Sequence, residues 1–234
     1  MIIKPFSRIK LSLTITGILL ILASCSSTKS SSTRYELSKK EKTEGYKILF
    51  DGTNMDQWTS NTNEYILQDG CIVMQPTDGY GNLYSKEEFD DFILRFEFQL
   101  TPEANSGLGI RHKMITGANG YDGMELQILD NSASIYDNLK PYQYHGSLYG
   151  WLAAKRGYLK PVWEWNHQEV IAKGDHLIVV LNGSVILDGK IKDLTKDTPP
   201  EKVPPTLFYQ KGHIAFLGHN SVVKFRNIRI KELE

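Results

Sequence analysis

Two Asx-Gly dipeptides, each between short runs of β-favouring residues, constrain the fold of this chain more than any other feature of its sequence. Asp69-Gly70 lies at the centre of residues 65–74, and Asn182-Gly183 lies within residues 176–187. Such dipeptides favour the type I′ turn of a two-residue hairpin, because that turn requires positive φ at both central positions. The sequence therefore predicts two antiparallel β-hairpins.

The remaining strand signals are sufficient for two packed sheets. Phe or Leu occupies every second position of residues 92–100, which is the period of a strand packed on one face. Further short strands are expected at residues 106–111, 124–129, 168–172, 214–217 and 222–230. No helical period persists beyond a turn or two. We therefore predict an all-β fold, specifically a two-sheet jelly-roll sandwich.

The N-terminus carries the signals of an exported lipoprotein. Three basic residues precede an apolar stretch at residues 11–22, which is too short to form a stable transmembrane helix. The stretch ends as Leu22-Ala23-Ser24-Cys25, which resembles the bacterial lipobox, whose cysteine is acylated and becomes the mature N-terminus. We expect a signal peptide at residues 1–24.

The domain organisation follows from this targeting segment. Residues 25–45 are expected to form a flexible tether lipidated at Cys25, because they begin with a Ser/Thr/Lys-rich run that has no apolar periodicity. A single β-sandwich domain at residues 46–234 follows. The expected location is the cell envelope, with the lipid in the outer membrane and the domain facing the periplasm.

Composition and charge bear on the class of partner. The 27 basic and 27 acidic residues cancel, so no net field attracts the chain to nucleic acid. Aromatic residues make up 11% of the chain, and they can stack on the apolar faces of sugars as well as fill a core. The second cysteine, Cys71, lies in a predicted strand and is expected to be a small buried side chain.

The strongest candidate for a functional site is the predicted strand at residues 124–129. Its apolar residues share one face, which places Glu125 and Gln127 together on the other face. Residues 131–166 follow without regular periodicity but are rich in Tyr and Trp, a composition that argues against disorder. This segment can fold over Glu125 and Gln127 and form a groove. A solvated outer face is the alternative interpretation.

Three further residues are candidates for the same site. His145, in the aromatic segment, and His219 are the histidines best placed for acid, base or ligand roles. No two histidines have the spacing of a compact metal motif, so a metal site would need ligands from several strands. Arg111, on the strand expected before Glu125, could bind an oxyanion or pair with a structural carboxylate.

The spacing of Glu125, Gln127 and Asp130 also permits a retaining glycosidase. It is similar to the E-x-D-x-x-E strand of laminarinase-type enzymes, in which a bulge brings two carboxylates onto one face. Gln127 and Asp130 replace the second and third acids of that pattern. We therefore keep this mechanism as an alternative.

Several segments together resemble one family. They are Ile48-Leu49-Phe50-Asp51-Gly52 with Trp58, Leu94-Arg95-Phe96-Glu97-Phe98, Asn105-Ser106-Gly107, Glu125-Leu126-Gln127-Ile128-Leu129-Asp130-Asn131, Gly146-Ser147-Leu148-Tyr149, Glu164-Trp165-Asn166 and Phe225-Arg226-Asn227-Ile228. Over residues 46–233 they resemble the 3-keto-disaccharide hydrolase family, which implies a concanavalin A-like lectin/glucanase sandwich. Where many members have Gln-Asp-His near the C-terminus, this sequence has Leu217-Gly218-His219, so only the histidine carries over.

The resemblance implies a glycoside substrate whose ring carries a ketone at C3. Such a ketone acidifies the C2 proton, so that a base can form an enolate, the C1 substituent can leave, and water can add. We expect Glu125 or His145 to be the base. The substrate-binding candidates are Arg111, Gln127, Asp130, Tyr149, Trp151, Arg156 and His219, with Tyr149 and Trp151 as a stacking platform and Arg111, Gln127 and His219 near the C3 oxygen.

Other functions and a cofactor remain open at this stage. A divalent metal ion near the C3 oxygen is a further candidate, with Glu125, His145 and His219 as its candidate ligands. The same sandwich could instead be a non-catalytic carbohydrate-binding lectin, a laminarinase-type glucanase or a structural envelope lipoprotein. In each of the first two cases the expected partner is a carbohydrate, with the membrane contacted through the N-terminal lipid.

Overall fold

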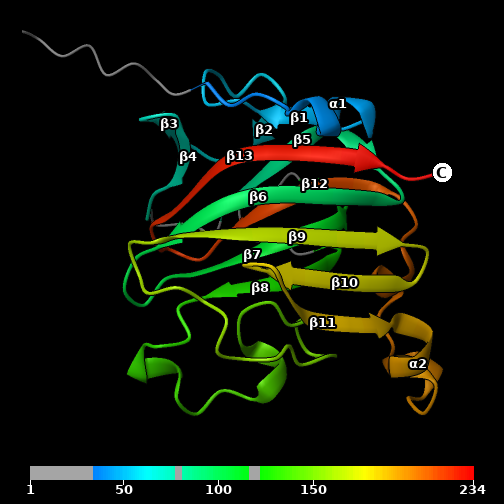
Figure 1. Ribbon diagram of the computed structural model, residues 1–234. Coiled ribbons are helices and arrows are strands. Elements are labelled where there is room, and N and C mark those ends of the chain that lie inside the picture. Colours follow the sequence, from blue (N-terminus) through cyan, green and yellow to red (C-terminus); the bar gives the residue numbers. More distant parts are fainter. Residues whose placement is uncertain (1–33, 77–80, 116–121) are drawn as a thin grey trace, which may run out of the picture. The chain divides into compact units, whose positions relative to one another are not determined.

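The computed structural model of the chain describes residues 34–76, 81–115 and 122–234. The predicted signal peptide and the predicted lipidation site, Cys25, lie outside these residues. Within the described ranges, no helix is both long enough and apolar enough to cross a membrane. The domain is all-β and consists of two antiparallel sheets, as the sequence predicts (Figure 1).

The larger sheet is the front layer in Figure 1. Its strands are β1 (Lys47–Phe50), β3 (Tyr65–Gln68), β4 (Cys71–Met74), β6 (Phe92–Leu100), β9 (Trp165–Lys173), β10 (His176–Leu181), β11 (Ser184–Lys190) and β13 (Val223–Glu232). They lie in the order β11-β10-β9-β6-β13-β4-β3, and β1 pairs with β13. Both predicted hairpins, β3–β4 and β10–β11, are present. All four turn residues have positive φ, from 50° to 86°, which confirms the predicted turn chemistry.

The smaller sheet lies behind the larger one. Its strands are β2 (Trp58–Ser60), β5 (Asn82–Phe89), β7 (Asn105–His112), β8 (Met124–Leu129) and β12 (Gly212–Gly218), in the order β2-β5-β12-β7-β8. Three strands, β1, β2 and β5, are not among those predicted from the sequence. β1 and β2 are very short, and the run Lys86-Glu87-Glu88 interrupts the apolar alternation of β5.

The two sheets pack their apolar faces together. Phe96 and Phe98 of β6, Phe216 of β12 and Phe225 of β13 are fully buried, and the ring centroids of Phe216 and Phe225 lie 3.8 Å apart. Met124, Leu126 and Ile128 of β8 belong to the same core. Because side chains alternate along a strand, the intervening residues of β8 point to the outer face of the smaller sheet.

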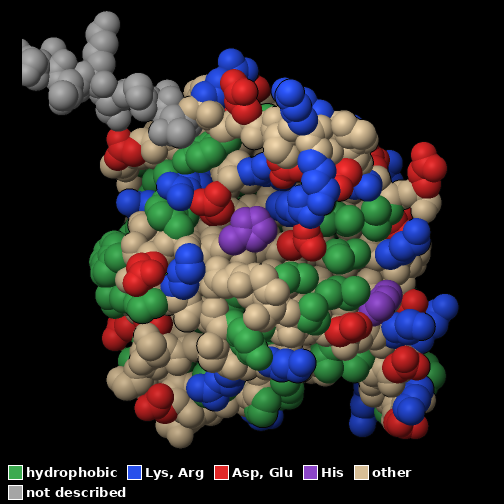
Figure 2. All heavy atoms as spheres, viewed as in Figure 1, with side chains coloured by type: hydrophobic (Ala, Val, Ile, Leu, Met, Phe, Trp, Pro, Cys, Tyr) green, Lys and Arg blue, Asp and Glu red, His purple; other side chains and the backbone are tan. Residues whose placement is uncertain are grey.

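The N-terminal part of the domain begins earlier than the sequence predicts. Residues 39–43, within the expected tether, form the helix α1 (Lys39–Thr43), which Ser38 caps. The carboxylate of Glu41 lies 2.7 Å from Arg229 and 3.6 Å from Arg95 on the larger sheet. The sequence does not predict this helix as part of the domain, because charged rather than apolar side chains join it to the sheet. Basic and acidic side chains lie interspersed over this face of the molecule (Figure 2).

The remaining connections contain short helices. They are η1 (Ser134–Tyr136), η2 (Pro141–Gln143), α2 (Ile191–Thr195), η3 (Pro200–Lys202) and η4 (Pro205–Phe208). Residues 131–164 form a long irregular segment, as predicted, and its central part runs along the free edge of β8. An antiparallel bridge pairs Leu148 with Leu126, and the backbone N–H of Tyr149 donates to the carbonyl of Glu125 at 2.9 Å. The segment is thereby held against β8.

Candidate active site

Glu125 and Gln127 lie on the outer face of the smaller sheet but are shielded from solvent. Their exposed fractions are only 6% and 4%, because residues 131–164 cover the end of the sheet at β8. A cavity of about 200 Å³, here called the polar cavity, lies beside them. Its lining residues are Asn105, Glu125, Gln127, Leu129, Tyr136, Leu139, Gln143, Tyr149 and His219. The structure thus contains a hollow between the polar strand and the aromatic segment.

Glu125 supplies a buried carboxylate at the edge of the polar cavity. Its Oε1 atom is inaccessible to solvent, and no described residue donates a hydrogen bond to either carboxylate oxygen. The Nε2 atom of His219 lies 3.8 Å from Oε1. Gly107 makes room for the side chain, since a Cβ atom at that position would lie 2.1 Å from Oε1. Because Glu125 also lines the polar cavity, its carboxylate is placed to accept a proton from a ligand bound there.

Gln127 and Asn105 form an amide pair whose orientation is set by the backbone. The Nε2 atom of Gln127 donates to the carbonyl of Ser106 at 3.3 Å and to Oδ1 of Asn105 at 2.7 Å. Because a backbone carbonyl can only accept, the amide nitrogen of Gln127 must face it, and Asn105 must present its oxygen to Gln127. The oxygen of Gln127 and the nitrogen of Asn105 are left as an acceptor and a donor for a ligand.

Asn105 lines the polar cavity, although it is not among the site residues predicted from the sequence. The signal that could have found it is the pairing of β7 with β8, in which Asn105 lies opposite Leu129 and next to Gln127 on the same face. That pairing brings together residues from two strands joined by a long connection. The strand pattern alone does not specify such a register.

A second cavity, of about 520 Å³, shares Glu125 and Tyr149 with the polar cavity and is here called the apolar cavity. Its lining residues are Gly123, Met124, Glu125, Leu148, Tyr149, Gly150, Trp151, Pro204, Thr206 and Leu207. The predicted stacking residues Tyr149 and Trp151 therefore both line a cavity that Glu125 also borders. The two rings border different spaces, however, since Trp151 lines only the apolar cavity.

His145 lines neither of these cavities. Its ring is fully buried and stacks on Phe98, with the ring centroids 5.1 Å apart. The N–H of Leu129 donates to Nδ1 at 3.4 Å, which places the ring proton on Nε2, 3.1 Å from Oε1 of Gln168. Burial lowers the pKa of His145 to about 4. Since both nitrogens are engaged in the core, this placement does not support the predicted role of His145 as the base.

Arg111 also lies outside both cavities. Its side chain is 1% exposed and donates to the carbonyls of Asp90, Gly174 and Tyr209 at 2.7 to 3.2 Å. Its Nη2 atom lies 2.8 Å from the carboxylate of Asp91. Of the two roles considered for Arg111, this geometry favours the structural ion pair over the binding of a substrate oxyanion.

Asp130 and Arg156 line a third cavity of about 700 Å³, which shares no lining residue with the polar or the apolar cavity. The carboxylate of Asp130 accepts hydrogen bonds from the N–H of Glu103 and from Ser132, and the guanidinium of Arg156 lies 3.8 Å from the ring centroid of Tyr144. The register between β7 and β8 has no shift. No bulge therefore brings Asp130 to the face of Glu125, and the laminarinase-type carboxylate pair is not formed.

The candidate metal ligands do not converge. Both ring nitrogens of His145 are hydrogen-bonded in the core, to Leu129 and Gln168. Of the three candidate metal ligands, only Glu125 and His219 therefore lie near each other. Among the described residues, no group of three or more His, Cys, Asp and Glu side chains is arranged to hold a metal ion. The residues considered as metal ligands are therefore not arranged to bind a metal ion.

Comparison with known sequences identifies a family. A family model described as a 3-keto-alpha-glucoside-1,2-lyase-like domain matches residues 45–231. A relative from Bacteroides thetaiotaomicron, described as a 3-keto-disaccharide hydrolase, is 25% identical in an alignment 231 residues long. This alignment covers 82% of this chain and 79% of the relative. The matched range includes every segment on which the resemblance in the sequence rests.

Comparison with solved structures confirms the jelly-roll sandwich. Two proposed glycosyl hydrolases from Parabacteroides distasonis superpose with TM-scores of 0.76 and 0.69. The first is 22% identical and covers 86% of this chain and all of its own, and the second is 27% identical and covers 80% and 99%. The carbohydrate-binding module CBM66 from Bacillus subtilis has a TM-score of 0.51 at 14% identity, covering 76% of this chain and 98% of its own. At that identity the likeness concerns the fold alone.

Proposed function

The chain belongs to the 3-keto-alpha-glucoside-1,2-lyase-like family, and on this basis we propose that it cleaves the glycosidic bond of glycosides whose ring carries a ketone at C3. The observation that carries the proposal is the Glu125 carboxylate, which is buried beside the polar cavity and accepts no hydrogen bond from the described residues. A site that only binds sugar needs donors and acceptors, whereas a site that removes a carbon-bound proton needs a base. Glu125 has the position and chemistry of such a base.

The proposed reaction begins at C2. The C3 ketone makes the C2 proton acidic, and Glu125 removes this proton to form an enolate. The C3 carbonyl then re-forms, the C1–O bond breaks, and the leaving group departs with the bonding electrons. Water then adds across the C1–C2 double bond, with its hydroxyl on C1 and a proton on C2, so that the net reaction is hydrolysis.

The other polar residues of the cavity supply the binding groups. The amide nitrogen of Asn105 is a donor suited to the C3 oxygen, where negative charge develops in the enolate. The amide oxygen of Gln127 is an acceptor suited to a ring hydroxyl. His219, 3.8 Å from Glu125, is placed to interact with the base and with the same ring.

The proposal is tested by comparing methyl glucosides with their C3-oxidised forms as substrates of the purified chain. We expect cleavage of the 3-keto form only, and a loss of roughly 10²- to 10⁴-fold in kcat for Glu125→Gln, which keeps the shape of the side chain but cannot accept the proton. Glu88→Gln is the matched control, because Glu88 lies on β5 of the same sheet but lines neither the polar nor the apolar cavity.

Several results would count against the proposal. Cleavage of the unoxidised glucoside alone would point to a conventional glycosidase, and full activity of Glu125→Gln would remove the proposed base. An unsaturated sugar that accumulates without taking up water would show that the chain catalyses elimination but not hydration. Product analysis in ¹⁸O-labelled water separates these cases.

A carbohydrate-binding function is the second candidate. It is favoured by the fold shared with a carbohydrate-binding module and by the two aromatic side chains, Tyr149 and Trp151, that line the apolar cavity. In that case the chain would bind glycans saturably, Glu125→Gln would keep the affinity, and neither substrate would be cleaved. Calorimetric titration alongside the turnover assay distinguishes the two functions.

We also propose that Cys25 carries a lipid that holds the domain at the envelope, facing the periplasm. The support is the lipobox-like Leu22-Ala23-Ser24-Cys25 after a short apolar stretch. Expression of the full chain in a bacterial host should give a membrane-associated product, and Cys25→Ser should release it. Mass spectrometry that finds an unmodified Cys25 in the membrane fraction would contradict this assignment.

A further inference from the structure

Glu125 and Tyr149 are common to the linings of the polar and the apolar cavity. The polar cavity offers three amides and an imidazole and therefore matches a ring with several hydroxyls and a ketone. The apolar cavity, bordered by Trp151 and Leu207, matches the less polar face of a leaving group. A glycoside that occupies both spaces would place the bond between its two parts beside Glu125 and Tyr149.

The two side chains also share one face of the sheet. Leu148 pairs with Leu126 in an antiparallel bridge, so that Tyr149 lies directly opposite Glu125, and their backbones are joined by a 2.9 Å hydrogen bond. Side chains opposite each other in such a pair have Cβ atoms about 4.5 to 5.5 Å apart. The bonds that change in the reaction are on adjacent carbons, C1 and C2, so neighbouring residues can act on both.

The hydrogen-bonding of Tyr149 leaves its own proton available. The backbone N–H of Lys140 donates to Oε1 of Gln143 at 3.0 Å, which orients this amide. The amide nitrogen of Gln143 must then donate to the phenol oxygen of Tyr149, at 2.8 Å. The hydroxyl of Tyr149 makes no further hydrogen bond to the described residues, and the residue is 41% exposed. Its proton can therefore be directed to a ligand.

We propose that Tyr149 is the general acid that protonates the leaving oxygen, a role that rests on the proposed function and extends it. Glu125 takes the C2 proton, and the C–H electron pair forms the enolate. As the C3 carbonyl re-forms, the C1–O bond breaks and the leaving oxygen takes the proton of Tyr149. Water then gives its hydroxyl to C1 and its proton to the phenolate, while Glu125 returns its proton to C2. Both residues end in their starting state.

Acid strength and position both favour Tyr149 for this step. A phenol is a stronger acid than a sugar hydroxyl, so transfer to a departing alkoxide is favourable. His219, the other candidate acid, lines only the polar cavity and lies beside the carboxylate that must accept the C2 proton. Gln143 is a positioning residue, because its hydrogen bond holds the phenol oxygen while leaving the proton free.

The test uses two 3-keto-glucosides that differ in their leaving group. A 4-nitrophenyl group leaves readily as an anion and needs no proton, whereas a methoxy group does. For Tyr149→Phe we expect the kcat on the methyl substrate to fall about 10²- to 10⁴-fold and the kcat on the nitrophenyl substrate to stay within about threefold. Tyr158→Phe is the matched control, since Tyr158 is in the same segment and 40% exposed but lines neither cavity.

A second measurement separates the acid from the base. In D₂O, Tyr149→Phe should still exchange the C2 proton of the uncleaved methyl substrate for deuterium, whereas Glu125→Gln should not. An equal loss on both substrates, or no loss on either, would overturn the role of Tyr149 while leaving the proposed function intact. Absence of cleavage of both substrates by the unmodified chain would reject the proposed function and the acid together.

Discussion

Substitution of Gly107 by Ala should inactivate the protein through Glu125, although Gly107 bears no functional group. A Cβ atom at this position would lie 2.1 Å from Oε1, 2.7 Å from Cδ and 2.8 Å from Cγ of Glu125. Ordinary contacts of a Cβ atom begin at 3.4 Å, so the carboxylate must move by about 1.3 Å or more. A displacement of about 1 Å at a catalytic group can cost about 100-fold in rate. We expect a loss of that size in kcat on a 3-keto-glucoside.

Gly109→Ala is the matched control for this change. Gly109 lies on the same strand and the same face, opposite Glu125, but the atoms nearest to its Cβ would belong to His112 at 2.7 Å and Ala215 at 3.0 Å rather than to Glu125. The assay is steady-state kinetics of both variants, with urea unfolding to compare their stability. The reasoning is refuted if Gly107→Ala keeps its kcat, or if both variants lose activity equally, which would indicate damage to the sheet instead.

The remaining predictions concern stability and binding. Burial lowers the pKa values of His112 and His145 to about 4. Between about pH 4 and 6.5 the unfolded chain therefore binds more protons than the folded chain. The free energy of unfolding should decrease as the pH is lowered through that range, by up to about 1.4 kcal/mol per pH unit for each histidine. Urea unfolding at pH 7 and pH 5 checks this, and equal stabilities would contradict it. Arg111→Met should lower the free energy of unfolding by about 3 to 5 kcal/mol, because it removes the buried ion-pair partner of Asp91. The kcat/KM of the folded protein should not change. A selective loss of kcat/KM would indicate that Arg111 acts in the active site. Asn105→Ala should lower kcat about 10²-fold or more if its nitrogen binds the enolate oxygen, whereas an effect on KM alone would make it a ground-state binding residue.

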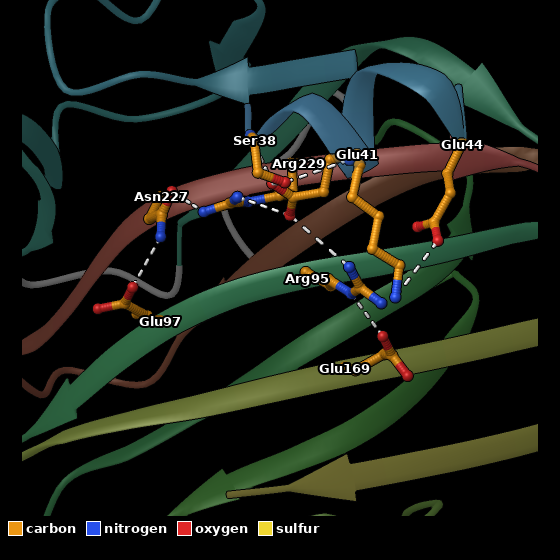
Figure 3. Close-up of polar contacts among 9 residues, drawn as sticks. Ser38, Glu41, Glu44, Arg95, Glu97, Glu169, Asn227 and Arg229 are labelled. Carbon is orange, nitrogen blue, oxygen red and sulfur yellow. Dashed lines mark hydrogen bonds and ion pairs between the residues drawn. The ribbon is translucent and has the colours of Figure 1, made fainter. Parts of the chain in front are cut away.

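Local patterns predicted most of the fold. The Asx-Gly turns and the alternation in β6 depend on neighbouring residues and on one buried face, and both are present in the structure. By contrast, β5 carries a Lys-Glu-Glu run, and the helix α1 is joined to the sheet by ion pairs, as the labelled contacts of Glu41 with Arg95 and Arg229 illustrate (Figure 3). An element held by charges far apart in sequence leaves no periodic signal.

The sequence predicted only those site residues whose placement follows from the alternation of side chains along β8. Alternation alone placed Glu125 and Gln127 on one face, and the position of the aromatic segment indicated a cover over them. His145 lies in that covering segment, but its ring turns into the core to meet Phe98, which no local pattern encodes. The pairing of β7 with β8 brings Asn105 to the polar cavity. Strand pairing and ring orientation depend on tertiary contacts, so the positions of Asn105 and His145 could not be predicted from the sequence.

The two outer faces of the sandwich show why chemistry is expected at one of them. On the larger sheet, the carboxylate of Glu169 lies 2.5 Å from Arg95, and that of Glu41 lies within 4 Å of both Arg95 and Arg229 (Figure 3). A carboxylate in such a network has its lone pairs engaged by charged donors, so it is a poor acceptor for a proton from a ligand. Glu125, on the smaller sheet, has no arginine or lysine among its ion-pair partners and no hydrogen-bond donor from the described residues. A sandwich that binds sugars would gain proton-transfer chemistry by leaving one acid uncommitted and covering it, and this combination distinguishes Glu125 from the acids of the larger sheet.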